Sequence, residues 1–172
     1  MRGAMAKITL QGREIHTNGE LPKVGDSAPN FSLVDNELAD RSLKDFKGKR
    51  KILSIVPSLD TGVCATSAKK FNEAISKHPE ITLLVISADL PFAQKRFCGL
   101  ENLKNLTALS MMRNKDFAKS YGVLIQDGPL AGLSARAIVV LDDKDKVIYT
   151  ELVPEIAQEP NYDKALHAAL KK

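Results

Sequence analysis

The stretch Ile52-Leu53-Ser54-Ile55-Val56-Pro57-Ser58-Leu59-Asp60-Thr61-Gly62-Val63-Cys64 decides the fold of this chain. It begins with a nearly continuous apolar run, which is typical of a strand that is buried on both faces. Pro57 ends this strand because proline has no N–H group to donate to the ladder. A helical pattern then runs from about Gly62 to Lys77. The stretch therefore predicts a buried strand that leads through a short loop into a helix.

The same order repeats directly downstream. A second apolar strand is predicted for Ile81 to Ala88, and a second helix for Leu90 to about Leu103. We expect Asp89 and Pro91 to start this helix. Its core-facing positions are predicted to be Ala93, Phe97 and Leu100. Buried strands separated by helices indicate an α/β fold with a parallel core and helices on both faces of the sheet.

Shorter patterns complete the predicted domain. They indicate a hairpin of Lys7–Leu10 and Arg13–His16, strands at Phe31–Val34, Leu106–Leu109, Ala137–Leu141 and Val147–Tyr149, a helix around Lys115–Tyr121, and a last helix capped by Asn161 with Tyr162, Leu166, Ala169 and Leu170 on one side. No repeat or long linker divides the chain, so residues 1–172 are predicted to form one domain. Residues 1–5 are expected to be disordered or a remnant of cloning.

Composition argues against several function classes. The chain has 172 residues, with 25 basic against 21 acidic side chains, no Trp and 5% aromatic residues. Nucleic acid is not an expected partner, because the positive excess is small and few rings are available to stack on bases. The basic run Lys47–Lys51 is predicted to be a solvated turn. The apolar run Ile81–Ile86 is too short to span a membrane, and no secretory signal is visible, so we expect a cytoplasmic protein without a membrane partner.

The chain has two cysteines, Cys64 and Cys98. They are too far apart for a CxxC redox pair, and the histidines show no ligand spacing, so neither a metal nor another cofactor is expected. Lone cysteines are often small buried apolar residues. The surroundings of Cys64 favour a reactive thiol instead. We expect the Thr61 hydroxyl to cap the helix by accepting a hydrogen bond from the N–H of Cys64, where free amides and the helix dipole favour thiolate.

Two further features bear on the environment of this sulfur. Cys64 shares one helix face with Ala68, Phe71 and Ile75, so we expect it to be sheltered within the core. Arg136 stands at the start of an apolar strand, where a cation must be paired or bind an anion. The position alone leaves a structural salt bridge and a role in anion binding equally open.

Pro57, Thr61 and Cys64 fit the pattern P-x-x-x-T-x-x-C at the end of a strand, and here the chain resembles the peroxiredoxins. The longer stretches Pro57–Cys64 and Asp89–Cys98 are similar to the bacterial thiol peroxidases, the atypical two-cysteine branch of that family. The similarity covers nearly the whole chain and includes the N-terminal hairpin, Tyr121–Ile125, Ala135–Ala137 and Glu159–Asp163.

The resemblance implies a thioredoxin-like fold, with a central mixed sheet flanked by helices, and reduction of hydrogen peroxide or organic hydroperoxides. Cys64 matches the peroxidatic cysteine, which becomes a sulfenic acid, and Cys98 matches the resolving cysteine of the same subunit. Thioredoxin would reduce the resulting disulfide. Pro57 belongs to the motif, Thr61 would hydrogen-bond the sulfur and the peroxide, and Arg136 would stabilise the thiolate. Members of the family are typically homodimers, so we expect one here.

One alternative function stays open at this point. A non-catalytic redox sensor or binding module would use the same disulfide only to change conformation. In either case a disulfide needs the two α-carbons within about 7 Å, which two intact helices would not provide. We therefore predict that one or both helices unwind locally during the cycle, with Gly62 and Gly99 easing the change.

Overall fold

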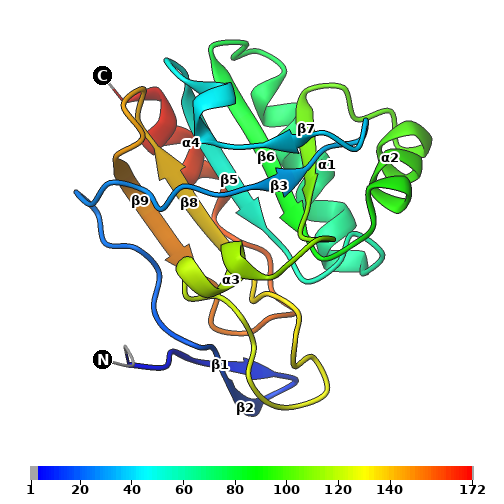
Figure 1. The fold of residues 1–172 in the computed structure, drawn as a ribbon, viewed down its shortest axis with the longest axis vertical. Helices are drawn as coiled ribbons and strands as arrows, with labels where there is room; N and C mark the ends of the chain where they lie inside the picture. Colours follow the sequence, from blue (N-terminus) through cyan, green and yellow to red (C-terminus); the bar gives the residue numbers. More distant parts are fainter. Residues whose placement is uncertain (1–3, 172) are drawn as a thin grey trace.

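The computed structural model describes residues 4–171 of the chain, and residues 1–3, which belong to the segment expected to be disordered, lie outside this range. The elements follow one another as β1 (Lys7–Leu10), β2 (Arg13–His16), β3 (Leu33–Val34), β4 (Asp40–Arg41), the 3₁₀ helix η1 (Leu43–Phe46), β5 (Arg50–Ile55), α1 (Gly62–Ile75), β6 (Ile81–Ser87), α2 (Pro91–Leu100), β7 (Leu106–Ser110), α3 (Asp116–Ser120), β8 (Ala137–Leu141), β9 (Val147–Leu152) and α4 (Tyr162–Leu170). Figure 1 shows their arrangement.

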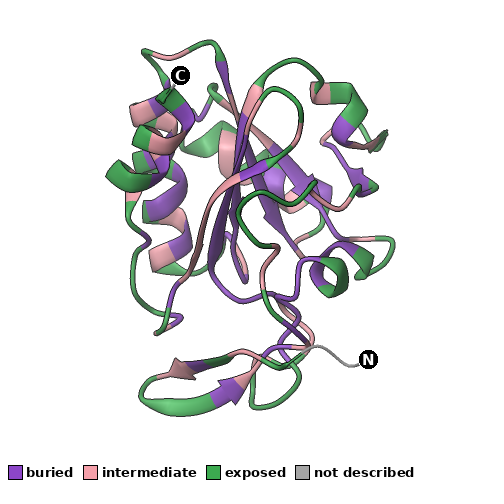
Figure 2. Ribbon diagram, turned by 90° about the vertical axis from the view of Figure 1, so that its left-hand side faces the viewer, coloured by how far each residue is buried: buried purple, intermediate pink, exposed green. Residues whose placement is uncertain are grey.

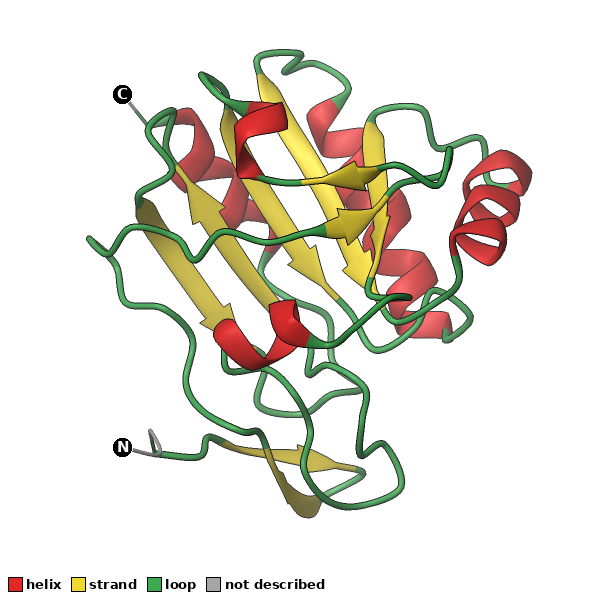
Figure 3. Ribbon diagram, in the orientation of Figure 1, coloured by secondary structure: helices red, strands yellow, loops and turns green. Residues whose placement is uncertain are grey.

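A mixed sheet of seven strands organises the fold, in the order β4-β3-β7-β6-β5-β8-β9. The central strand β5 runs parallel to β6 and antiparallel to β8, so the parallel and antiparallel halves meet there. Figure 3 shows helices on both faces of this sheet and the separate β1–β2 hairpin beyond one end. The prediction of an α/β fold with a central mixed sheet and an N-terminal hairpin is confirmed.

The sheet separates two hydrophobic clusters. Side chains alternate along β5, so Ile52 faces one cluster and its neighbour Leu53 faces the other. Both faces of the sheet are therefore buried against apolar side chains, which explains why the predicted strands are continuous apolar runs in the sequence. Figure 2 shows these central strands as buried along most of their length.

Helices α1 and α4 cover the face of the sheet that lies away from the viewer in Figure 1. The predicted inner face of α1 is confirmed, because Cys64, Ala68, Phe71 and Ile75 are all buried. The Phe71 ring packs edge-on against Tyr162 of α4, with ring centroids 4.8 Å apart. Burial of a side chain of this size contributes about 1.5–3 kcal/mol, so Phe71 holds α1 against both α4 and the sheet.

The N-terminal hairpin forms as predicted. Gln11 and Gly12 adopt φ values of 50° and 78°, which produce the turn that fits the twist of a two-residue hairpin. The Glu155 carboxylate accepts hydrogen bonds from the Thr9 hydroxyl at 2.6 Å and from the backbone N–H groups of Gln11 and Gly12. These donors, led by Thr9, lower the pKa of Glu155 to about 2. The hairpin is thus fastened to the loop before α4.

Two predicted helix positions are wrong. Leu100 of α2 is 79% exposed, because the inner side of this helix passes through Pro91 and Gln94, and Leu100 points elsewhere. Leu170 of α4 is 38% exposed, because the helix buries the preceding residue, Ala169, and the next residue turns by about 100° around the axis. The capping of α4 is confirmed, since the Asn161 side chain accepts a hydrogen bond from the Lys164 N–H.

The basic run is only partly the solvated turn that we predict. Lys47 and Lys49 are exposed, whereas Lys51 lies within β5 and is fully buried. Its ammonium group pairs with the Asp145 carboxylate and donates to the Lys49 carbonyl at 2.8 Å. A buried lysine is tolerated only with such partners, and Asp145 comes from the distant β8–β9 turn. Among residues 4–171, no helix is long and apolar enough to cross a membrane.

Candidate active site

The strand register brings Arg136 to the place where the chain leaves β5 for Cys64. Ile55, the last residue of β5, pairs with Ala137, the first residue of β8. Arg136 directly precedes β8 and therefore lies at the same edge of the sheet as the loop that follows β5. Its Nη2 atom donates a hydrogen bond to the Cys64 Sγ atom at 3.2 Å. The Arg136 guanidinium therefore bonds to the sulfur directly.

Arg136 is a buried cation with an unusual set of partners. It is 2% exposed, its Nε atom donates to the Ile156 carbonyl at 2.9 Å, and its Nη1 atom has no hydrogen-bond partner among the described residues. No carboxylate in residues 4–171 bonds to it directly, so of the two roles left open by position the structure does not show the salt bridge. The guanidinium is therefore a charged donor that bonds directly to the sulfur inside the core.

The first turn of α1 places the sulfur. Cys64 is the third residue of this helix and is fully buried. In the first turn of a helix the backbone N–H groups have no intrahelical acceptor, and the helix dipole favours negative charge. The sulfur is therefore carried by the positive end of the helix dipole and contacts the Arg136 guanidinium.

The predicted cap by the Thr61 hydroxyl is wrong. Thr61 does hold the N-cap position of α1, with extended φ and ψ of −96° and 146°, but its side chain makes no capping bond. The hydroxyl instead donates to the Ser58 carbonyl at 3.1 Å. Threonine hydroxyls can bond to nearby backbone groups on either side, and here the loop carbonyl is the partner. The hydroxyl thus closes the loop before α1 and leaves the Cys64 amide uncapped by it.

Pro57 fixes the exit of the chain from β5. It is buried, and its predecessor Val56 is held on both sides. The Val56 N–H donates to the Ile86 carbonyl at 3.0 Å, and the Ser134 hydroxyl donates to the Val56 carbonyl at 2.9 Å. A residue without an N–H group suits the next position, where the ladder ends. Pro57, Thr61, Cys64 and Arg136 therefore meet at one edge of the sheet.

Cys98 stands apart from this group. It is the eighth residue of α2, it is half-buried, and both cysteines are free thiols in the structure. Burial raises the pKa of the Cys98 thiol above its usual value. Its side chain packs against the same hydrophobic cluster that contains Cys64, and the two sulfurs are not bonded to each other.

Asp89 does not start α2 as we predict. The N-cap of α2 is Leu90, and no side chain caps the helix. Of the two residues predicted to start α2, only Pro91 belongs to it, as its first residue. The Asp89 carboxylate instead accepts hydrogen bonds from the loop before Cys64, at Ser58 and Leu59. Sequence reasoning also misses the Ile156 carbonyl that holds Arg136, because a backbone acceptor leaves no local signal in a sequence.

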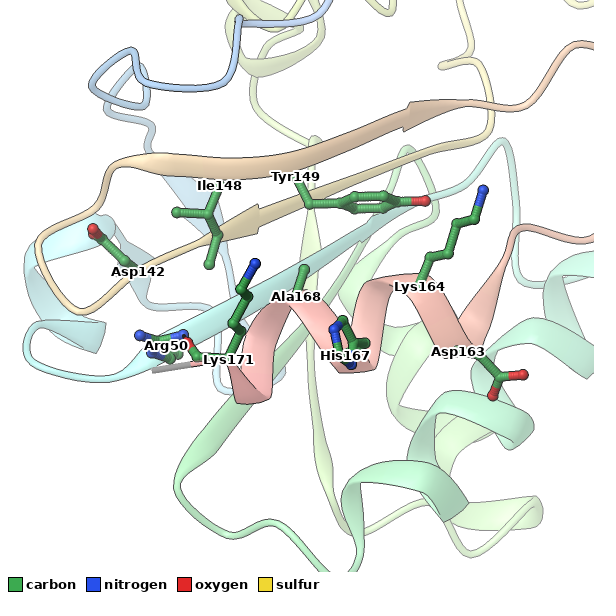
Figure 4. A pocket seen from close by; sticks show the side chains of 9 residues that line it. All are labelled: Arg50, Asp142, Ile148, Tyr149, Asp163, Lys164, His167, Ala168 and Lys171. Carbon is green, nitrogen blue, oxygen red and sulfur yellow. Dashed lines mark hydrogen bonds between the residues drawn. The ribbon is translucent and has the colours of Figure 1, made fainter.

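A separate groove lies at the other end of the sheet. It has a volume of about 810 Å³ and is lined by α4, by strand β9, by Arg50 at the start of β5 and by Asp142 in the turn after β8 (Figure 4). Arg50, one of its lining residues, begins β5, whereas Cys64 follows the opposite end of that strand, about 20 Å away. The Arg50 guanidinium donates to the Ala169 carbonyl at 3.3 Å and so completes the end of α4. This groove is distinct from the cysteine site.

An α/β fold of this kind, with a buried cysteine in the first turn of a helix and an arginine bonded to its sulfur, defines a thiol-dependent redox enzyme. Comparison with known proteins makes the class specific. The Redoxin family model matches residues 23–166. A thiol peroxidase of Corynebacterium glutamicum is 51% identical over 95% of this chain and 99% of its own length.

Solved structures agree with this class. A peroxiredoxin-like protein from Aquifex aeolicus is 43% identical and superposes with a TM-score of 0.90, over 97% of this chain and 98% of its own. A thiol peroxidase from Chromobacterium violaceum is 28% identical with a TM-score of 0.86, over 92% and 91% of the two chains. The chain belongs to the thiol peroxidase family of peroxiredoxins, and it has their thioredoxin-like fold. The predicted family, fold and enzyme class are confirmed.

Proposed function

We propose that Cys64 is the peroxidatic cysteine of this thiol peroxidase and acts on hydrogen peroxide and on organic hydroperoxides. The Cys64 thiolate attacks one peroxide oxygen, so an S–O bond forms while the O–O bond breaks. The departing oxygen takes up a proton and leaves as water or an alcohol, and Cys64 becomes a sulfenic acid. The observation that carries this proposal is the 3.2 Å contact between Arg136 Nη2 and Cys64 Sγ in a buried site.

The surrounding residues support this step in different ways. In the proposal Arg136 stabilises both the thiolate and the charge that develops on the breaking O–O bond, and its unpartnered Nη1 atom is a donor available to the substrate. Thr61 closes the loop through the Ser58 carbonyl and presents its hydroxyl near the sulfur-bearing turn. Pro57 is buried in the loop between β5 and Cys64 and adds no N–H group that would need a partner there.

We propose further that Cys98 resolves the sulfenic acid within the same subunit. The Cys98 thiolate attacks the Cys64 sulfur, an S–S bond forms, and the sulfenic oxygen leaves as water. Both helices are intact in the structure, so local unwinding of one or both remains part of the proposal. A side chain at Gly62 or Gly99 would meet no atom within 4 Å, so packing does not explain these glycines, and their flexibility is available to the change.

The remaining parts of the cycle follow from the same proposal. Thioredoxin reduces the Cys64–Cys98 disulfide by thiol–disulfide exchange. The protein acts as a homodimer in the cytoplasm, where reduced thioredoxin is maintained, and residues 1–172 serve as one catalytic domain. Neither nucleic acid nor a membrane takes part, and the cysteines need no cofactor.

Steady-state consumption of hydrogen peroxide and cumene hydroperoxide, coupled through thioredoxin and its reductase, tests the proposal. We expect repeated turnover by the wild type and none by Cys64→Ser. Turnover that persists in Cys64→Ser would overturn the role of Cys64. A wild type that forms the disulfide once and then stops would instead support the sensor alternative, in which the disulfide only changes conformation.

A further inference from the structure

The Asp89 carboxylate lies between the two segments that carry the cysteines. It occupies the turn from β6 to α2 and is half-buried. Its Oδ1 atom accepts a hydrogen bond from the Ser58 hydroxyl at 2.6 Å. Its Oδ2 atom accepts from the Leu59 N–H and from the Ser87 hydroxyl, both at 2.7 Å. Three short bonds to an ionisable acceptor form a rigid junction, because bonds to a charged group are the stronger kind.

One arm of this junction reaches the helix of Cys64. The Ser58 carbonyl accepts hydrogen bonds from the Thr61 N–H at 3.3 Å and from the Thr61 hydroxyl at 3.1 Å. Thr61 is the N-cap of α1, and its carbonyl accepts the first helical bond, from the Ala65 N–H. The position of the first turn of α1, and hence of Cys64, therefore depends on a loop that Asp89 holds at Ser58 and Leu59.

The other arm reaches the helix of Cys98. The Ser87 hydroxyl accepts a hydrogen bond from Gln94 Nε2 at 3.0 Å, and the same nitrogen donates to the Leu109 carbonyl. Gln94 is fully buried and lies one helical turn before Cys98. The carbonyl of Asp89 itself accepts from the Ser110 hydroxyl. The beginning of α2 is thus fixed to the sheet through Asp89 and Gln94.

We propose that Asp89 is a positioning residue that locks the loop before Cys64 to the start of the Cys98 helix in the reduced enzyme. The lock holds the first turn of α1 in the geometry that attacks peroxide. It also opposes the rearrangement that brings the cysteines together, since movement of the loop away from α2 must break the bonds to Ser58 and Leu59. This second consequence rests on the proposed resolving role of Cys98.

Asp89→Asn tests the lock with little change of shape. The asparagine keeps one oxygen to accept from the Leu59 N–H and the Ser87 hydroxyl, but it loses the negative charge, and its NH₂ group replaces the oxygen that accepts from the Ser58 hydroxyl. Rapid-quench experiments with thiol alkylation and mass spectrometry measure two rate constants in a single turnover, attack of Cys64 on hydrogen peroxide and formation of the Cys64–Cys98 disulfide. We expect attack to slow about tenfold and disulfide formation to accelerate by a similar factor, the scale of one bond to a charged group.

Asp35→Asn is the matched control. Asp35 is another poorly exposed carboxylate with several protein donors, the N–H groups of Glu37 and Ala39 and the Arg41 side chain, but it serves the β3–β4 turn. General loosening of the fold would affect both variants alike, whereas the lock predicts opposite changes in the two steps for Asp89→Asn alone. Ser58→Ala removes the Ser58 bond to Asp89 and leaves the Leu59 bond in place. This second variant is expected to shift both rate constants in the same directions by a smaller factor.

The two rate constants separate failure of this proposal from failure of the proposed cycle. If the wild type forms the Cys64–Cys98 disulfide but Asp89→Asn shows unchanged rate constants, or changes matched by Asp35→Asn, the lock is refuted. If the wild type forms no such disulfide, the resolving role of Cys98 is wrong, and the attack step still decides the positioning role of Asp89. If Asp89→Asn does not fold, wild-type rate constants in Ser58→Ala overturn the proposal.

Discussion

Replacement of Arg136 by methionine removes the cation that faces the Cys64 sulfur while keeping an unbranched side chain of similar length. The Nη2–Sγ bond of 3.2 Å is buried, so solvent does not screen it. Hydrogen bonds to charged groups contribute about 1.5–3 kcal/mol. If that contribution is realised in the transition state, attack on peroxide should slow by about 10- to 150-fold, since about 1.4 kcal/mol corresponds to a factor of ten.

Competition with horseradish peroxidase for hydrogen peroxide gives the second-order rate constant for this step. Arg136→Lys is the matched variant, because it keeps the charge but cannot bond both the Cys64 sulfur and the Ile156 carbonyl through a planar fork. We expect its rate constant to lie between those of the wild type and Arg136→Met. A folded methionine variant that attacks peroxide at the wild-type rate would refute the reasoning.

Three further changes test other parts of the structure. Cys98→Ser should retain the first oxidation of Cys64 and lose thioredoxin-linked cycling; equal steady-state turnover in this variant would contradict the resolving role. The Glu155 carboxylate, with its pKa lowered to about 2 from 4.5, stabilises the fold above pH 4.5 and loses this contribution as the pH falls towards 2. Urea unfolding at successive pH values should therefore show a steeper acid loss for the wild type than for Glu155→Gln, and equal slopes would speak against the assignment. Gly122→Ala places a methyl carbon 2.1 Å from the Glu20 carbonyl oxygen at a φ of +70°, so unfolding in urea should show a loss of about 1–3 kcal/mol or more, whereas an unchanged midpoint would exclude this strain.

The sequence was sufficient to predict the sheet because its central strands are buried on both sides. The apolar runs at 52–56, 81–88 and 137–141 are buried on both faces only when they form central strands with helices on each side of the sheet. Pro57 marks the end of a strand, and Asn161 marks the start of a helix. Pro57 and Cys64 were also placed correctly, just after the strand and in the first turn of the next helix. These predictions depend on local patterns, which a single sequence displays directly.

The features that sequence reasoning missed depend on partners that are distant along the chain. Thr61 had two backbone partners within reach, and only the folded loop shows that its hydroxyl turns to Ser58. An aspartate shortly before a proline is a typical signal for the start of a helix. The partners that Asp89 bonds instead, Ser58 and Leu59, lie a whole helix and strand earlier in the chain. Lys51 likewise required Asp145 before burial of its charge became acceptable. Such long-range pairings are set by the topology and not by the local pattern.

The central claim is that Cys64 carries out the peroxide chemistry and Cys98 resolves it within one chain. Treatment of the fully reduced protein with one equivalent of hydrogen peroxide, followed by alkylation and peptide mass spectrometry, tests this most directly. We predict a cross-linked Cys64–Cys98 peptide in the wild type, and a sulfenic acid trapped by dimedone at Cys64 in Cys98→Ser. Oxidation that leaves Cys64 as a free thiol, or that first appears at Cys98, would contradict the account.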